Sequence, residues 1–355
     1  MKTKQYGAID IMKILCALLI VCAHFISENA TGRINRYIDY ASSIYVIVVP
    51  FFFFCGGYFL FQKIIANPDA AKNNIKGYIK RIMLMYGVWS AIYILFTLLK
   101  WIRFGVSSDE VVKYIVNSLL YSTYKTIWFL PAMCIGVLMT YILGRKIGYI
   151  KTMYISFVFY LIGALGVSYS FLITSNQMLK GILDTYNYWF ESARNGVFNA
   201  FPFIAMGAYM AKKNASETSE PDNKNNLIKY FILCCCFAVA FIIEAFVIKL
   251  KFNAVNANTL IMLIPFTWCF VGFGLSVRMP ANNCTKWMRK MSSAIFVCQR
   301  VFLTAIPELL PGSIFATLLS SNPYLGLAYV IVITTMLSAF IVYISSKNKY
   351  LAVIC

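Results

Sequence analysis

Apolar segments long enough to cross a lipid bilayer recur along the whole of this 355-residue chain, and they limit its fold more than any other feature. About ten such segments are present, since a membrane-spanning helix needs roughly 20 residues. Apolar residues make up 60% of the chain and charged residues only 13%, which excludes a soluble domain of this size. The sequence therefore predicts an all-α polytopic membrane protein, with spans near residues 8–27, 41–62, 78–99, 126–143, 152–174, 194–211, 229–249, 258–278, 291–310 and 323–346.

Basic residues gather in alternate loops between these spans, as expected for cytoplasmic segments. Their distribution predicts that both termini are cytoplasmic, and the recurring spans predict a multi-pass protein of the cell (inner or plasma) membrane. The first segment lacks a small-x-small cleavage site, so we expect it to remain as a span. We expect residues 1–355 to form a single transmembrane domain, with a flexible cytoplasmic loop near 212–228 and an amphipathic helix over Asp109–Tyr121 at the outer surface.

The net charge of +19 is explained by this loop distribution, so we expect no nucleic-acid partner. Most of the 11 cysteines lie in apolar runs and are interpreted as small buried hydrophobes, neither a disulfide framework nor a metal site. The chain has a single histidine, which makes a zinc site improbable as well. We therefore expect no metal and no bound cofactor.

That single histidine, His24, lies in the first span, and Lys13 precedes it on the same segment. On a helix the two side chains would be about 20° apart around the axis and about 16 Å apart along it. Ionisable groups are costly in hydrocarbon and usually serve a function there. His24 is a candidate general base, with Glu28 one turn later to orient the ring. The structural alternative is that Lys13 reaches the inner headgroups and His24 bonds a neighbouring carbonyl.

Four further features carry candidate chemistry. An aromatic run ends in Gly56, Gly57 and Tyr58, which predicts a close approach of two backbones. Lys80 and Arg81 begin the third span, either as ordinary cytoplasmic charges or as a phosphate site. Trp128 begins the fourth span in the position of an interfacial anchor. We also expect the charges at or within spans to face the protein interior and pair, and these are Arg194, Glu244 and Arg300.

Taken in order, these motifs resemble those of the membrane-bound acyltransferase 3 family. The family's hallmark is Arg or Lys, ten residues, then His, and it is matched by Lys13 and His24. The resemblance extends over essentially the whole chain, with ten spans as in the family. Further matches are Gly57-Tyr58, Tyr78-x-Lys80-Arg81, Trp128-Phe129-Leu130, the stretch from Arg194 through Phe198 to Gly207, and Ser292-Ser293-Ala294-Ile295-Phe296.

The resemblance implies transfer of an acyl group, often acetyl, from cytoplasmic acyl-CoA to a hydroxyl of an extracytoplasmic glycan or lipid-linked sugar. It assigns His24 as the base, Lys13 as its paired cation and Arg81 to the donor. Lys80 would join Arg81 against the CoA phosphates. We also predict a set of further substrate-binding or oxyanion-stabilising candidates, namely Tyr58, Trp128, Arg194, Ser292 and Ser293.

Three positions depart from the family pattern, because Gly56, Leu84 and Gln299 stand where Ser, Arg and His are common. The chain also resembles the membrane half of the amino-acid racemases linked to glycopeptide resistance, although we expect no racemase domain here. An alternative function is therefore an uptake module or transporter for an amino acid or sugar. Transporters often show inverted repeats, and none is visible in this sequence.

Overall fold

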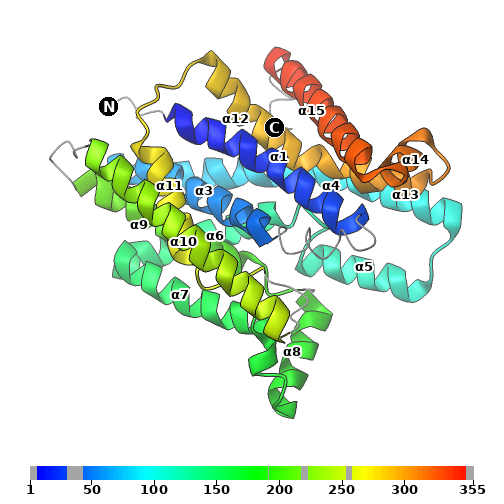
Figure 1. Cartoon of the computed structure of the whole chain (residues 1–355), viewed down its shortest axis with the longest axis horizontal. Coiled ribbons are helices and arrows are strands. Elements are labelled where there is room, and N and C mark those ends of the chain that lie inside the picture. The colour runs from blue at the N-terminus through cyan, green and yellow to red at the C-terminus, as the bar shows by residue number, and fades with distance from the viewer. Residues whose placement is uncertain (1–5, 30–42, 191, 217–222, 253–257, 349–355) are drawn as a thin grey trace. The chain divides into compact units, whose positions relative to one another are not determined.

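The computed structural model describes residues 6–29, 43–190, 192–216, 223–252 and 258–348 (Figure 1). Regular structure within these ranges is helical throughout, which confirms the all-α fold. The elements are α1 (Gly7–Asn29), η1 (Ser43–Ile47), α3 (Val48–Ala66), α4 (Ala71–Phe104), α5 (Ser108–Leu120), α6 (Phe129–Ile147), α7 (Tyr149–Gly166), η2 (Ser170–Leu172), α8 (Gln177–Phe190), η3 (Gly196–Ala200), α9 (Phe201–Ser216), α10 (Asn223–Phe252), α11 (Leu263–Ser276), α12 (Asn283–Arg300), η4 (Val301–Ala305), α13 (Ile306–Leu309), α14 (Ile314–Ser321) and α15 (Pro323–Lys347).

Among the described residues, 7 helices are long and apolar enough to cross a membrane, so the chain is a multi-pass membrane protein. They overlap the predicted spans except those near 194–211, 258–278 and 291–310. These three fall on the shorter or more polar helices α9, α11 and α12 with its continuation. The total of about ten spans, roughly 20 residues each, stays a prediction. The cytoplasmic placement of the termini also stays a prediction, since residues 1–5 and 349–355 lie outside the described ranges.

The chain divides into two compact units, and α1, α3 and α4 each contribute residues to both. The first unit contains Met1–Ile9, Val49–Ile82 and Phe129–Met279. Within it, α6, α7 and α9 pack against one another, and α10 packs along α11 (Figure 1). The predicted loop near 212–228 is only partly described: α9 ends at Ser216, α10 begins at Asn223, and residues 217–222 lie outside the described ranges.

Two glycines allow α3 and α9 of the first unit to touch backbone to backbone. A Cβ added to Gly57 would lie 2.9 Å from the Cα of Ile204 and closer still to its carbonyl oxygen. A Cβ on Gly207 would lie 2.7 Å from the backbone nitrogen of Tyr58. The close approach predicted from the paired glycines is therefore confirmed, since only a residue without a Cβ fits at either position.

Glu244 on α10 caps the start of α11 in the same unit. Its carboxylate accepts hydrogen bonds from the backbone nitrogens of Ile261 and Met262, each at 2.8 Å, and from the hydroxyl of Tyr169. Burial raises the pKa of the Tyr169 phenol, so this hydroxyl stays protonated and donates. Glu244 thus satisfies backbone donors that precede a helix, and a carboxylate is favoured at such a position.

The second unit contains Asp10–Val48, Met83–Trp128 and Pro280–Cys355. Its helix α15 packs against α12 and α14 (Figure 1). The helix predicted over Asp109–Tyr121 is confirmed as α5, which begins with a capping box between Ser107 and Glu110. No residue of α5 is buried, and an exposed apolar stripe runs through Val112, Ile115 and Leu119. Its location at the outer surface stays a prediction.

Candidate active site

Lys13 and His24 both lie on α1, which is helical from Gly7 to Asn29. The predicted geometry therefore holds, with the two side chains on one face and about 16 Å apart along the axis. Both side chains are partly buried. Lys13 and His24 have different charged neighbours. These neighbours lie on α12 of the second unit and on α1 itself.

Arg300, the last residue of α12, is the cation in contact with His24. Its Nη2 lies 2.8 Å from His24 Nδ1, across 276 positions of sequence. Its Nη1 forms an ion pair with Glu28 and lies 3.4 Å from the hydroxyl of Thr304. The side chain of Arg300 is only 5% exposed and that of Glu28 is 25% exposed. Glu28, which was expected to orient the ring, thus contacts the guanidinium that contacts His24.

Aromatic residues of α4 and of the loop between α5 and α6 hold the end of α12. The hydroxyl of Tyr93 donates to the carbonyl of Val297 at 2.6 Å, and the Tyr93 ring stacks on Tyr124 with centroids 4.3 Å apart. Burial, with a further contribution from the carboxylate of Glu308, raises the pKa of Tyr124, so this phenol is neutral. Arg300 is followed directly by the π-helical turn η4, a distortion that frequently occurs at functional sites.

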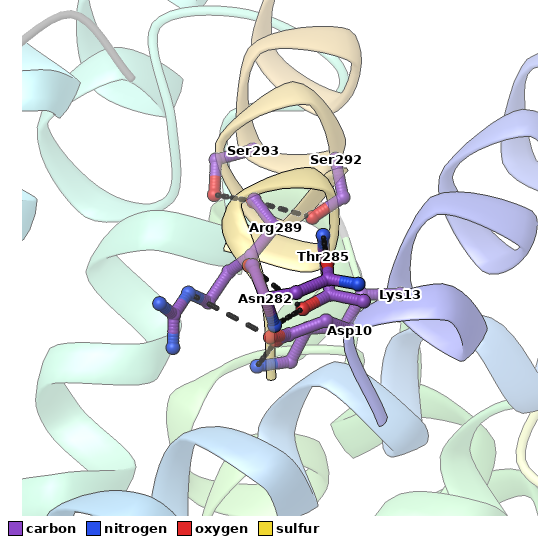
Figure 2. Close-up of polar contacts among 7 residues, drawn as sticks. All are labelled: Asp10, Lys13, Asn282, Thr285, Arg289, Ser292 and Ser293. Carbon is purple, nitrogen blue, oxygen red and sulfur yellow. Dashed lines mark hydrogen bonds and ion pairs between the residues drawn. The ribbon is translucent and has the colours of Figure 1, made fainter. Parts of the chain in front are cut away.

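Lys13 belongs to a second cluster, nearer the start of α1 (Figure 2). Its Nζ lies 4.0 Å from Asp10 Oδ1, and Nε of Arg289 on α12 lies 3.9 Å from the same oxygen. The Asp10 side chain is 5% exposed. The start of α12 is fixed here by a capping box in which Asn282 accepts from Thr285 N at 2.8 Å. One buried carboxylate thus faces two cations, one from α1 and one from α12.

Ser292 and Ser293 lie one turn after Arg289 on α12, beside this second cluster (Figure 2). Their hydroxyls donate to the backbone carbonyl of Arg289, at 2.8 Å and 3.5 Å. Along α12 they precede Arg300 by about 11–12 Å. Their position does not favour the oxyanion role predicted for them at His24, and that role stays a prediction.

The remaining predicted binding residues have different surroundings. Tyr58, Lys80, Arg81 and Arg194 belong to the first unit. The Tyr58 side chain is buried, and its hydroxyl lies 3.3 Å from that of Tyr6 and accepts from Asn214 Nδ2 at 3.1 Å. Its predicted role in substrate binding stays a prediction.

Lys80 and Arg81 are exposed on α4, which suits either a binding site or a cytoplasmic anchor. The Arg81 guanidinium lies 5.9 Å from the centroid of the Tyr78 ring. Arg194 is half-buried just before η3. Trp128 belongs to the second unit, where it is 8% exposed and stacks on Tyr121 with centroids 6.0 Å apart, which is more burial than an interfacial anchor needs.

Sequence reasoning did not connect Arg300 to His24, although one signal was present. Arg300 interrupts an apolar run and immediately follows Gln299, the position where the resembled family commonly has histidine. Gln299 is fully buried and its amide donates to the carbonyl of Phe296 at 3.0 Å. Gln299, which differs from the family's usual histidine, therefore directly precedes the arginine that contacts His24.

Comparisons with known proteins agree with the resemblance seen in the motifs. The model of a family described as an acyltransferase domain matches residues 6–344. Two proteins of Enterococcus faecalis named amino-acid racemase are each 26% identical to the chain, over 78% and 75% of its length. A serine/alanine racemase of Enterococcus gallinarum is 24% identical over 58% of the chain.

The alignments cover 37%, 36% and 29% of these three relatives, so the chain spans about a third of their length. No solved structure matches the chain.

Proposed function

The chain belongs to the membrane acyltransferase 3 family, and on that premise we propose that it is an integral membrane O-acyltransferase. The acyl group, acetyl in our proposal, comes from cytoplasmic acyl-CoA. The acceptor is a hydroxyl of an extracytoplasmic glycan or lipid-linked sugar. The observation that carries the proposal is the cluster of His24, Arg300 and Glu28, because three ionisable groups near the end of an apolar helix are costly unless they serve a function.

The two charged clusters of the second unit suit the two ends of such a reaction. The cations Lys13 and Arg289 beside Asp10 suit an anionic donor, since charge-assisted contacts hold phosphate strongly. From the family resemblance, Lys80 and Arg81, which lie in the part of α4 that belongs to the first unit, are also proposed to bind CoA phosphate. His24 lies farther along α1 and is proposed to face the reacting thioester.

The proposed reaction moves the acyl group from sulfur to oxygen and a proton from oxygen to sulfur. The acceptor oxygen bonds to the carbonyl carbon of the thioester, and the carbon–sulfur bond then breaks. The hydroxyl proton ends on the sulfur of CoA, so the products are an ester and free thiol. A negative oxygen develops on the carbonyl during the attack, and donors placed nearby stabilise it.

Proteoliposomes supplied with labelled acetyl-CoA test this function. We expect CoA release that depends on an added hydroxyl acceptor and is lost in His24→Ala. Lys13→Ala is expected to be weaker, whereas Lys146→Ala, which removes an exposed cation of α6, is a matched control expected to keep wild-type activity. Labelled acetyl-CoA that stays intact with every hydroxyl acceptor would contradict the proposal.

A second candidate function is favoured by the names of the relatives, which are amino-acid racemases. A guanidinium beside an imidazole presents hydrogen-bond donors that suit a carboxylate. The chain would then bind or take up an amino acid such as serine or alanine. Flux of labelled serine into the same proteoliposomes, without consumption of acetyl-CoA, would favour this function over acyl transfer.

A further inference from the structure

The contact between Arg300 and His24 determines which ring nitrogen carries the proton. An arginine side chain contains donors only and keeps its charge in proteins. Arg300 Nη2 lies 2.8 Å from His24 Nδ1, so Nδ1 must provide the lone pair of this hydrogen bond. A neutral imidazole that accepts at Nδ1 carries its proton at Nε2.

The surroundings of Arg300 hold the guanidinium in this position. Its side chain is 5% exposed, and its Nη1 is joined to Glu28 and lies near Thr304. Tyr93 fixes the carbonyl of Val297, one turn earlier on α12. The His24 ring therefore contacts a guanidinium that Glu28 and Thr304 hold in place. A positive charge on His24 would be repelled by this guanidinium.

This arrangement opposes the role that the sequence predicted for His24. A general base needs a lone pair directed at the substrate, but the lone pair of the ring is directed at Arg300. Accepting a proton at Nδ1 would break this hydrogen bond and place an imidazolium against a guanidinium. The N–H on Nε2, at the other side of the ring, is a donor.

We propose that Arg300 is a positioning residue that holds His24 in the Nε2–H tautomer, so that His24 serves acyl transfer as a hydrogen-bond donor. The inference rests on the proposed function. In the step described above, the Nε2–H donates to the carbonyl oxygen as that oxygen becomes negative. The proton of His24 stays on Nε2 throughout, and the hydroxyl proton passes to the sulfur of CoA.

The tautomer can be observed directly, because the chain has one histidine. The full chain, labelled with ¹⁵N-histidine and purified through a tag without histidine, is placed in lipid nanodiscs near neutral pH. We expect the ¹⁵N spectrum to show a protonated Nε2 and an unprotonated Nδ1. Arg300→Gln is expected to shift the ring towards the Nδ1–H form, and Arg300→Lys, which keeps a charged donor, to retain more of the Nε2–H form. A wild-type ring protonated at Nδ1 overturns the proposal.

Substitutions of His24 test the donor role through activity. The amide nitrogen of His24→Gln can replace the Nε2–H donor but cannot take up a proton, so we expect on the order of a tenth or more of the wild-type rate. His24→Asn has a shorter side chain that displaces the donor, and it is expected to lose about 100-fold to 1,000-fold, like His24→Ala. A folded His24→Gln that is as inactive as His24→Ala overturns the donor role.

The two proposals can fail separately. The ¹⁵N spectrum needs no substrate, so its result stands whether or not acyl transfer is found. An Nε2–H ring in a chain that never consumes acetyl-CoA contradicts the proposed function while leaving the tautomer assignment in place. An Nδ1–H ring in a chain that does transfer acyl groups contradicts only the present inference.

Discussion

Replacing Gly57 by alanine tests the close contact between α3 and α9. The added Cβ would lie 2.9 Å from the Cα of Ile204 and closer still to its carbonyl oxygen. These are backbone atoms, which cannot rotate away as a side chain could. Adding a methyl group to a tightly packed interface costs about 1–3 kcal/mol, and the upper end applies here. Alanine is better than glycine in a helix by about 1 kcal/mol, so the net destabilisation is about 2 kcal/mol.

Thermal unfolding in detergent or nanodiscs measures this difference. A thiol-reactive fluorescent dye reports unfolding, because Cys55, Cys134 and Cys269 of the first unit are buried. We expect Gly57→Ala to lower the apparent midpoint by about 4 °C. Gly77→Ala is the matched control, because a Cβ at Gly77 meets nothing within 4 Å and alanine should stabilise α4 slightly. A midpoint for Gly57→Ala at or above that of Gly77→Ala would refute the close contact.

Three further predictions follow from other contacts. Glu244→Ala leaves the backbone N–H groups that precede α11 without their acceptor, and we expect a loss of about 2–3 kcal/mol in the same thermal assay. Glu28→Gln removes the counter-charge of Arg300, and acyl transfer should fall about fivefold to tenfold in a chain that still unfolds near the wild-type temperature. Ser107→Ala removes the cap of α5 at a cost of about 1 kcal/mol, and hydrogen exchange should speed up in the first turn of α5 while α15 stays unchanged.

Local features of the fold could be predicted because they depend on residues near one another in sequence. Lys13 and His24 share one helix face because 3.6 residues make a turn, whatever packs against that face. The amphipathic pattern and the capping residues specify α5 in the same way. The paired glycines Gly56 and Gly57 predicted a close approach, but the partner, α9, is about 150 positions later and could not be identified from the pattern.

The candidate site could be predicted only in part, for the same reason. The cost of a charge in hydrocarbon predicted that Arg300 and Glu244 would have partners, but it did not say which. The structure gives Arg300 the ring of His24 and the carboxylate of Glu28, whereas Glu244 receives neutral donors. Ser292 and Ser293 were matched by order along the chain, and their hydroxyls bond their own helix.

The sequence by itself determined that this is an all-α membrane protein whose first helix carries an ammonium and an imidazole on one face. Periodicity and hydropathy depend only on residues close together in the sequence, so they can be read without knowing the tertiary structure. Only the tertiary structure decided that a guanidinium from α12 meets that imidazole at Nδ1. That contact depends on packing two helices whose residues are 276 positions apart, and no local pattern encodes it.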